Sequence, residues 1–74
     1  MDNGAWYAWL PDGIDYAEDI DLITLKEAYD RTQFFYDAMI PYRLVRVSSY
    51  PVGQALHGQT LYKPVEVLYY LKGV

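Results

Sequence analysis

Cysteine is absent from this chain of 74 residues, and its absence limits how so small a protein can hold a fold. It excludes a disulfide framework, a thiolate zinc site and a cysteine nucleophile together. A domain of this size buries only about 60% of the surface that its unfolded chain exposes, and most domains have about 100 residues or more. We therefore predict a single domain, 1–74, whose core depends on large side chains or on a second chain.

Large side chains are plentiful, because the chain has nine Tyr, two Trp and two Phe. Each of them buries about 150–250 Å² when it enters a core, so a core of this size cannot hide them all. Several aromatic side chains are therefore expected at the surface. Tyr and Trp are enriched in protein interfaces and their hot spots, so the tyrosine-rich composition fits a filled core or a partner-binding surface.

The clearest local pattern predicts one amphipathic helix over about 24–39. Thr24 and Glu27 have the spacing of a capping box, in which each side chain bonds to the backbone N–H of the other residue. Pro41 disfavours helical geometry at the residue before it, which ends the helix. Apolar side chains recur between these points at steps of three and four residues. This stripe comprises Leu25, Ala28, Tyr29, Thr32, Phe35, Tyr36 and Met39.

Strand-forming residues occupy the segments on either side of this helix. The first candidate strand is 6–10, which stops at a Pro-Asp-Gly turn signal, and the second is 42–50. A short candidate at 59–63 precedes a stronger one at 65–71, and Pro64 belongs at an edge or a bulge between them. We predict an α+β fold: a two-layer β-α-β-β domain with the helix on a mainly antiparallel three-stranded sheet. The helical crossover can place the first strand parallel to the second.

Alternation along the second strand divides its side chains between two faces of the sheet. One arrangement has the helix covering the face that carries Val45, Val47, Val67 and Tyr69. The other face would then stay open, and it would carry a second candidate set of partner-binding residues. This set is Tyr42, Arg46, Tyr50 and Tyr70.

Charge is divided unevenly along the chain. Residues 1–37 carry nine acids against two bases, a local charge of −7, whereas residues 38–74 carry one acid against four bases, a local charge of +3. Segment 12–21, DGIDYAEDID, holds five acids and no base, and we predict that it is an irregular acidic connection. Such asymmetry steers association with an oppositely charged surface.

We expect this acidic segment to dock onto a basic site of a protein partner, with aromatic side chains nearby as apolar contacts. Phe34 joins the site because it falls off the apolar stripe and lies among charged residues. Two alternatives are a solvated loop that favours the positive end of the following helix and a cation site, although the segment lacks the EF-hand ligand pattern. The candidate residues are Asp12, Asp15, Tyr16, Glu18, Asp19, Asp21 and Phe34.

Residues that usually carry catalysis are sparse. His57 is the one histidine and lies in the predicted loop 51–58, so no second histidine shares a metal with it. The five glycines are scattered singly, unlike those of a phosphate-binding loop, and no nucleophile motif surrounds Ser48 or Ser49. We expect no enzymatic activity, no cofactor and no metal.

The sequence thus predicts a small acidic binding protein that acts as an inhibitor or adaptor. In size and charge it resembles many phage-encoded inhibitors of host defence or nucleic-acid machinery. One alternative is a self-assembling subunit or homodimer that uses the aromatic sheet face. Another is binding of single-stranded nucleic acid through that face, which the net charge of −4 disfavours. Apolar runs are too short for a membrane helix, and the N-terminus lacks the basic region of a secretory signal, so we expect a cytoplasmic protein.

Overall fold

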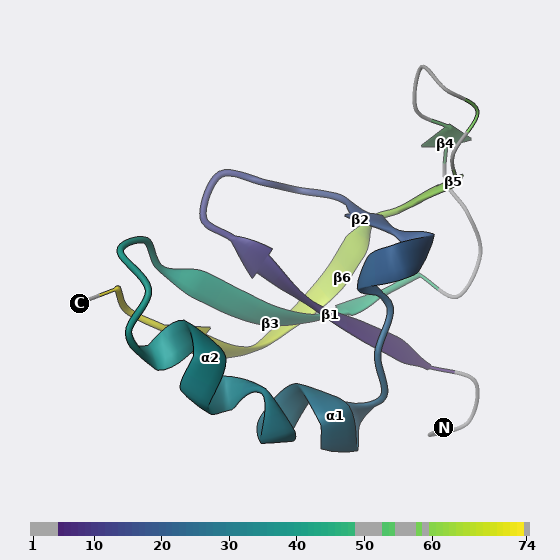
Figure 1. Cartoon of the computed structure of the whole chain (residues 1–74). Coiled ribbons are helices and arrows are strands. Elements are labelled where there is room, and N and C mark those ends of the chain that lie inside the picture. The colour runs from purple at the N-terminus through teal and green to yellow at the C-terminus, as the bar shows by residue number, and fades with distance from the viewer. Residues whose placement is uncertain (1–4, 49–52, 55–57, 59, 74) are drawn as a thin grey trace.

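The computed structural model describes residues 5–48, 53–54, 58 and 60–73. In these residues, two short helices pack with a three-stranded antiparallel sheet, and a smaller sheet lies beside it (Figure 1). The predicted α+β class is confirmed. The elements are β1 (Trp6–Pro11), β2 (Ala17–Glu18), η1 (Asp19–Asp21), α1 (Leu25–Asp30), α2 (Thr32–Tyr36), β3 (Tyr42–Val47), β4 (Gly53–Gln54), β5 (Thr60–Tyr62) and β6 (Pro64–Leu71).

Strand β3 lies in the centre of the main sheet and pairs antiparallel with β1 and with β6. The prediction of a parallel first strand is wrong. Pro11, the last residue of β1, pairs with Tyr42, the first residue of β3, and the Asp12 N–H donates to the Pro41 carbonyl at 2.9 Å. The helices therefore return the chain to the end of the sheet that it left, whereas a parallel pair needs a crossover to the opposite end.

The smaller sheet has the order β2-β5-β4. Its strand β5 lies within the candidate strand 59–63, and β6 matches the candidate 65–71 with one residue more. Pro64 begins β6 at a shift in the β3–β6 register, as its missing N–H predicted. Within the predicted loop 51–58, residues 53 and 54 pair with β5. His57 lies outside the described residues.

The predicted helix over 24–39 begins as expected. Thr24 Oγ1 accepts from the Glu27 N–H and Glu27 Oε1 accepts from the Thr24 N–H, both at 3.2 Å. The helix is nevertheless divided at Arg31, whose φ of −89° and ψ of 0° are not helical, and α2 ends at Tyr36. The prediction of one continuous helix to residue 39 is therefore wrong.

A side chain from the sheet forms a hydrogen bond with the helix just before this break. The Trp9 indole N–H donates to the Ala28 carbonyl at 2.8 Å, and this hydrogen bond is buried. In an unbroken helix the same carbonyl would accept from the backbone four residues later. Beyond the break, the Phe34 N–H would donate to Asp30 in an unbroken helix, but it donates to the Arg31 carbonyl, three residues back, at 3.0 Å. Tertiary contact with β1 thus competes with the regular helical pattern.

The helices cover the opposite face of the main sheet from the one that carries Val45 and Val67. Tyr69, which was grouped with these valines, pairs with Leu44 and contacts Trp9 on the helical side. Their side contains the first buried cluster, in which Leu25 and Phe35 of the helices pack on residues of the sheet. Because Trp9 pairs with Leu44 and Ala8 pairs with Val45 in the β1–β3 register, the large residues of β1 share a face with Leu44. The helices cover that face. The buried members of the cluster are Tyr7, Trp9, Ile23, Ala28, Leu44 and Leu71.

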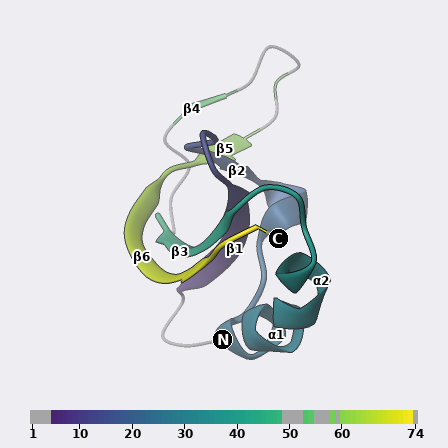
Figure 2. The same ribbon diagram turned by 90° about the vertical axis from the view of Figure 1, so that its left-hand side faces the viewer.

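The face that carries Val45 and Val47 is covered by the acidic segment and β5. Ala17 in β2 is fully buried there, and Ile14, Leu22 and Tyr62 pack against the same cluster. Figure 2 shows the main sheet as a strongly curved layer, with β2 and β5 above it and the two helices at its lower right. The prediction that one face of the sheet stays open is therefore wrong. The segment 12–21, predicted to be an irregular connection, includes β2 and η1 and covers the face that carries Val45 and Val47.

Candidate functional site

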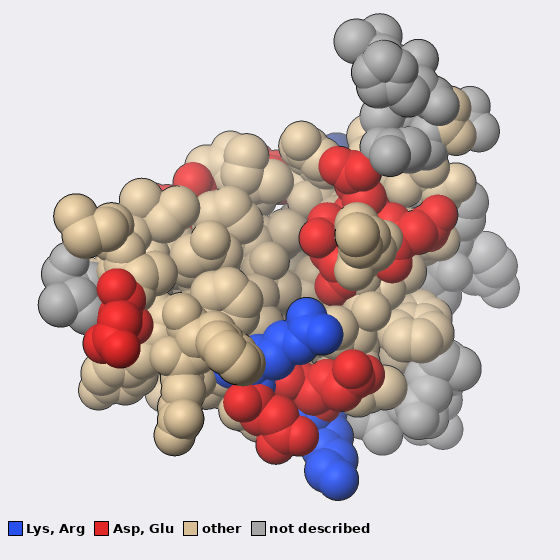
Figure 3. All heavy atoms as spheres, in the orientation of Figure 1, with Lys and Arg blue, Asp and Glu red and all other residues tan. Residues whose placement is uncertain are grey.

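The acidic segment turns its carboxylates outward while its small apolar side chains point into the core. Ala17 is buried, whereas Asp12, Asp15, Asp19 and Asp21 are exposed. Figure 3 shows acidic side chains gathered around a projecting uncharged group on the right of the visible face. The outward orientation of these aspartates thus concentrates negative charge at this surface.

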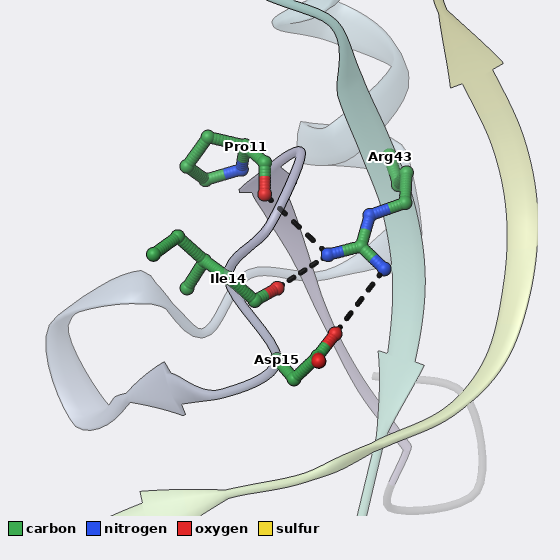
Figure 4. A network of polar contacts seen from close by, with 4 residues as sticks. All are labelled: Pro11, Ile14, Asp15 and Arg43. Carbon is green, nitrogen blue, oxygen red and sulfur yellow. Dashed lines mark hydrogen bonds and ion pairs between the residues drawn. The ribbon is translucent and has the colours of Figure 1, made fainter.

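Arg43 fastens the first half of the segment to β3. Its guanidinium donates to the backbone carbonyls of Pro11, at 3.4 Å, and of Ile14, and it forms an ion pair with Asp15 at 3.5 Å (Figure 4). The Arg43 side chain is only 17% exposed, but that of Asp15 is 76% exposed. Asp15 is therefore positioned by the fold and keeps most of its surface for solvent or a partner.

Two further acids of the predicted site accept hydrogen bonds from other residues of the chain. Asp21 Oδ2 accepts from the Glu18 N–H at 2.9 Å and closes the turn of η1. Asp19 accepts a hydrogen bond from the Tyr62 hydroxyl, which raises the pKa of that hydroxyl. The Asp19 contact links η1 to β5, and the Asp21 contact closes the turn, so both carboxylates have defined partners within the fold.

Ile20 lies at the tip of η1 between Asp19 and Asp21, and its side chain is 86% exposed. Ile20 was not among the predicted site residues, although an isoleucine between two acids in an otherwise polar turn is a recognisable signal in the sequence. A large aliphatic side chain held outward by a tight turn gives the acidic surface an apolar contact point.

A cavity of about 290 Å³ opens beside η1. Arg31 of the helices and Asp21 of η1 contribute opposite charges to its lining, and no ion pair joins them among the described residues. Its volume lies near the lower end of the range for small-ligand sites. Its apolar lining consists of Trp9, Pro11, Ile20, Ile23, Phe35 and Tyr42.

Phe34 is 80% exposed, as its position off the stripe predicts. It lines a different hollow, on the outer side of α1 and α2, together with Tyr29 and Tyr36. The structure therefore places it away from the cavity beside η1. Tyr16, by contrast, belongs to the acidic segment and is 44% exposed.

The second predicted set does not form one surface. Tyr42 packs against Phe35 with ring centroids 4.4 Å apart, beneath the helices. Arg46 pairs with Glu66 at 3.1 Å, and Tyr70 pairs in register with Arg43, on the face that the acidic segment covers. Tyr50 lies outside the described residues. The Tyr and Arg side chains needed for base stacking are therefore not brought together by the part of the chain that the structure describes.

Metal-ligating side chains do not gather in groups of three or more anywhere in the described residues. The described helices, of six and five residues, are too short to cross a membrane. Comparison with known proteins gives no relative: no family model, curated protein or solved structure matches this chain.

Proposed function

We propose that this protein is a non-catalytic binding domain that docks its acidic segment onto a basic surface of a protein partner, as an inhibitor or adaptor in the cytoplasm. The observation that carries the proposal is the fixed display of carboxylates around Ile20 on η1. An exposed apolar side chain ringed by charge combines the features of an interface centre and its polar rim.

Electrostatics supports a basic partner. The carboxylates of Asp15, Glu18 and Asp19 would compete with phosphates or other anions for Lys and Arg of that partner. Because exposed charges are screened beyond about 8–10 Å at physiological ionic strength, such binding weakens as salt rises.

The test is capture of partners from the native host lysate, with washes at low and high salt. The double variant Glu18→Gln, Asp19→Asn removes two charges from η1 and its cap, and the asparagine keeps an acceptor for Tyr62. The control, Asp30→Asn with Asp37→Asn, removes the same charge from exposed positions on α1 and at the C-terminal cap of α2. We expect a salt-sensitive partner that the first variant loses and the control retains. Equal retention by both variants would contradict the proposal.

Self-assembly is a second candidate, favoured by strand β6. This strand is eight residues long, lies at an edge of the main sheet and exposes Val65, Val67, Tyr69 and Tyr70. A long apolar edge is a template for pairing with another chain. Light scattering across a dilution series is expected to show a persistent dimer in this case, whereas a folded monomer at all concentrations would rule it out.

A further inference from the structure

We propose that the cavity beside η1 binds a small zwitterion, a molecule such as an amino acid that carries one ammonium group and one carboxylate group. This site is separate from the proposed partner contact, because Glu18 and Asp19 do not line the cavity. Its volume of about 290 Å³ suits a small molecule. Its free surface is mostly polar, since Trp9 and Ile23 in the lining are only 7% and 3% exposed.

Two opposite charges line this space from different elements. Asp21 contributes a carboxylate from η1, and Arg31 contributes a guanidinium from the junction of α1 and α2. No ion pair joins these two side chains within the described residues, so they lie farther apart than a direct contact allows. A ligand that carries both charges can therefore lie between them and contact each one.

Both charged side chains have hydrogen-bonding capacity left for a ligand. Asp21 Oδ2 accepts from the Glu18 N–H at 2.9 Å, which leaves Oδ1 for an ammonium group. The acid one turn before Arg31 is Glu27, but Glu27 Oε1 accepts from the Thr24 N–H and hydroxyl at 3.2 and 3.1 Å. In the described part of the chain the Arg31 guanidinium makes no hydrogen bond or ion pair, so its N–H donors are available to a carboxylate.

Charge complementarity selects a zwitterion over a ligand with a single charge. An ammonium group beside Asp21 and a carboxylate beside Arg31 each form a charge-assisted hydrogen bond. An amine without a carboxylate leaves Arg31 unpaired, and an acid without an ammonium group leaves Asp21 unpaired, so each loses one of the two contacts. The carbon chain between the two charges contacts the half-buried rings of Phe35 and Tyr42 in the lining.

NMR titration of the ¹⁵N-labelled full chain with three zwitterions tests this inference. These are glycine, 4-aminobutyrate and 6-aminohexanoate, in which the spacing of the two charges increases. Acetate, butyrate and hexanoate are the acid controls, and methylamine, butylamine and hexylamine are the amine controls. We expect one zwitterion to bind about fivefold more tightly than its own acid and amine, the effect of one additional exposed ion pair. Its shifts should include the Trp9 indole N–H and the backbone of Asp21 and Arg31.

The opposite results are equally clear. If every zwitterion binds no more tightly than its acid or its amine, one charge of the cavity contributes nothing and the inference is overturned. Absence of binding by all three zwitterions also overturns it. Neither result bears on capture of the basic partner, which is tested through Glu18 and Asp19, so the failures of the two proposals are distinguishable.

Substitutions assign a role to each charge. Arg31→Gln should reduce the affinity of the best zwitterion to that of its amine, whereas Lys26→Gln, at an exposed position of α1 that does not line the cavity, should leave it unchanged. Asp21→Asn keeps an acceptor for the Glu18 N–H and should reduce the affinity to that of the acid. Asp12→Asn, at an exposed position outside the lining, is its control. Unchanged affinity in Arg31→Gln or in Asp21→Asn would overturn the assignment of this cavity.

Discussion

The two faces of the main sheet are covered in different ways, yet each covering is held by one polar side chain from a strand beneath it. On one face, Trp9 of β1 donates to the Ala28 carbonyl of α1. On the other, Arg43 of β3 donates to the carbonyls of Pro11 and Ile14. The helical covering packs the Phe35 ring against Trp9 and Tyr42, whereas the acidic covering contributes the aliphatic side chains of Ala17, Ile14 and Leu22.

This difference shows how an acidic segment becomes part of a core. Its backbone carbonyls, rather than its carboxylates, accept the less exposed contacts with Arg43, and the carboxylates remain at the surface. The helical covering is joined to the sheet by a neutral indole donor. The acidic covering is joined by a charged guanidinium donor, which forms the stronger kind of hydrogen bond.

The largest expected effect is on the acidic covering. Arg43→Met keeps much of the apolar stem but removes every guanidinium hydrogen bond, and we expect it to lower the free energy of unfolding by about 3 kcal/mol. Urea denaturation measures this loss. Arg46→Met is the control on the same strand: its ion pair with Glu66 is exposed, so a cost of about 0–1 kcal/mol is expected. Equal costs would show that Arg43 does not fasten the segment.

The corresponding change on the helical covering is Trp9→Phe. It leaves the buried Ala28 carbonyl without its indole donor, and we expect a loss of about 2 kcal/mol. Trp6→Phe trims the other indole, which makes no hydrogen bond within the described residues, and serves as the control. If Trp9→Phe destabilises the protein more than Arg43→Met does, the proposed ranking of the two coverings is reversed.

A smaller effect is expected at the start of α1. Thr24→Ala removes the cap on the Glu27 N–H, at a cost of about 1 kcal/mol, whereas Thr24→Ser keeps the hydroxyl and should restore most of it. The midpoint of urea denaturation distinguishes the variants. An alanine variant with the wild-type midpoint would mean that this cap does not support the helical covering.

The smallest effect is a pH dependence of the same cap. Hydrogen bonds from the Thr24 backbone and side chain lower the pKa of Glu27, and the charge of Arg31 lowers it further. Because the folded pKa lies below the unfolded one, the stabilisation is present above the unfolded value and is lost as pH falls through the folded value. The cost of Glu27→Gln should therefore shrink between pH 7 and about pH 3. A cost that is the same at both pH values would contradict this linkage.

The sequence by itself determined the features that depend on near neighbours. The capping box at Thr24 and Glu27, the turn after β1, the break at Pro64 and the exposure of Phe34 all follow from local residue patterns. The α+β class also follows, because strand and helix periodicities alternate along the chain. The acidic composition of residues 12–21 is equally plain from the sequence.

Only the tertiary structure decided which elements pack against which face of the sheet. Strand alternation defines two faces but does not say which one a helix covers, and β1 resolved this by placing Tyr7 and Trp9 with Leu44. The helix broke at Arg31 where the Trp9 indole contacts the Ala28 carbonyl, a partner 19 positions away. Arg43 and Ile14, 29 positions apart, turned a charged connection into a covering layer. Such contacts depend on the three-dimensional approach of distant segments, which short-range periodicity does not encode.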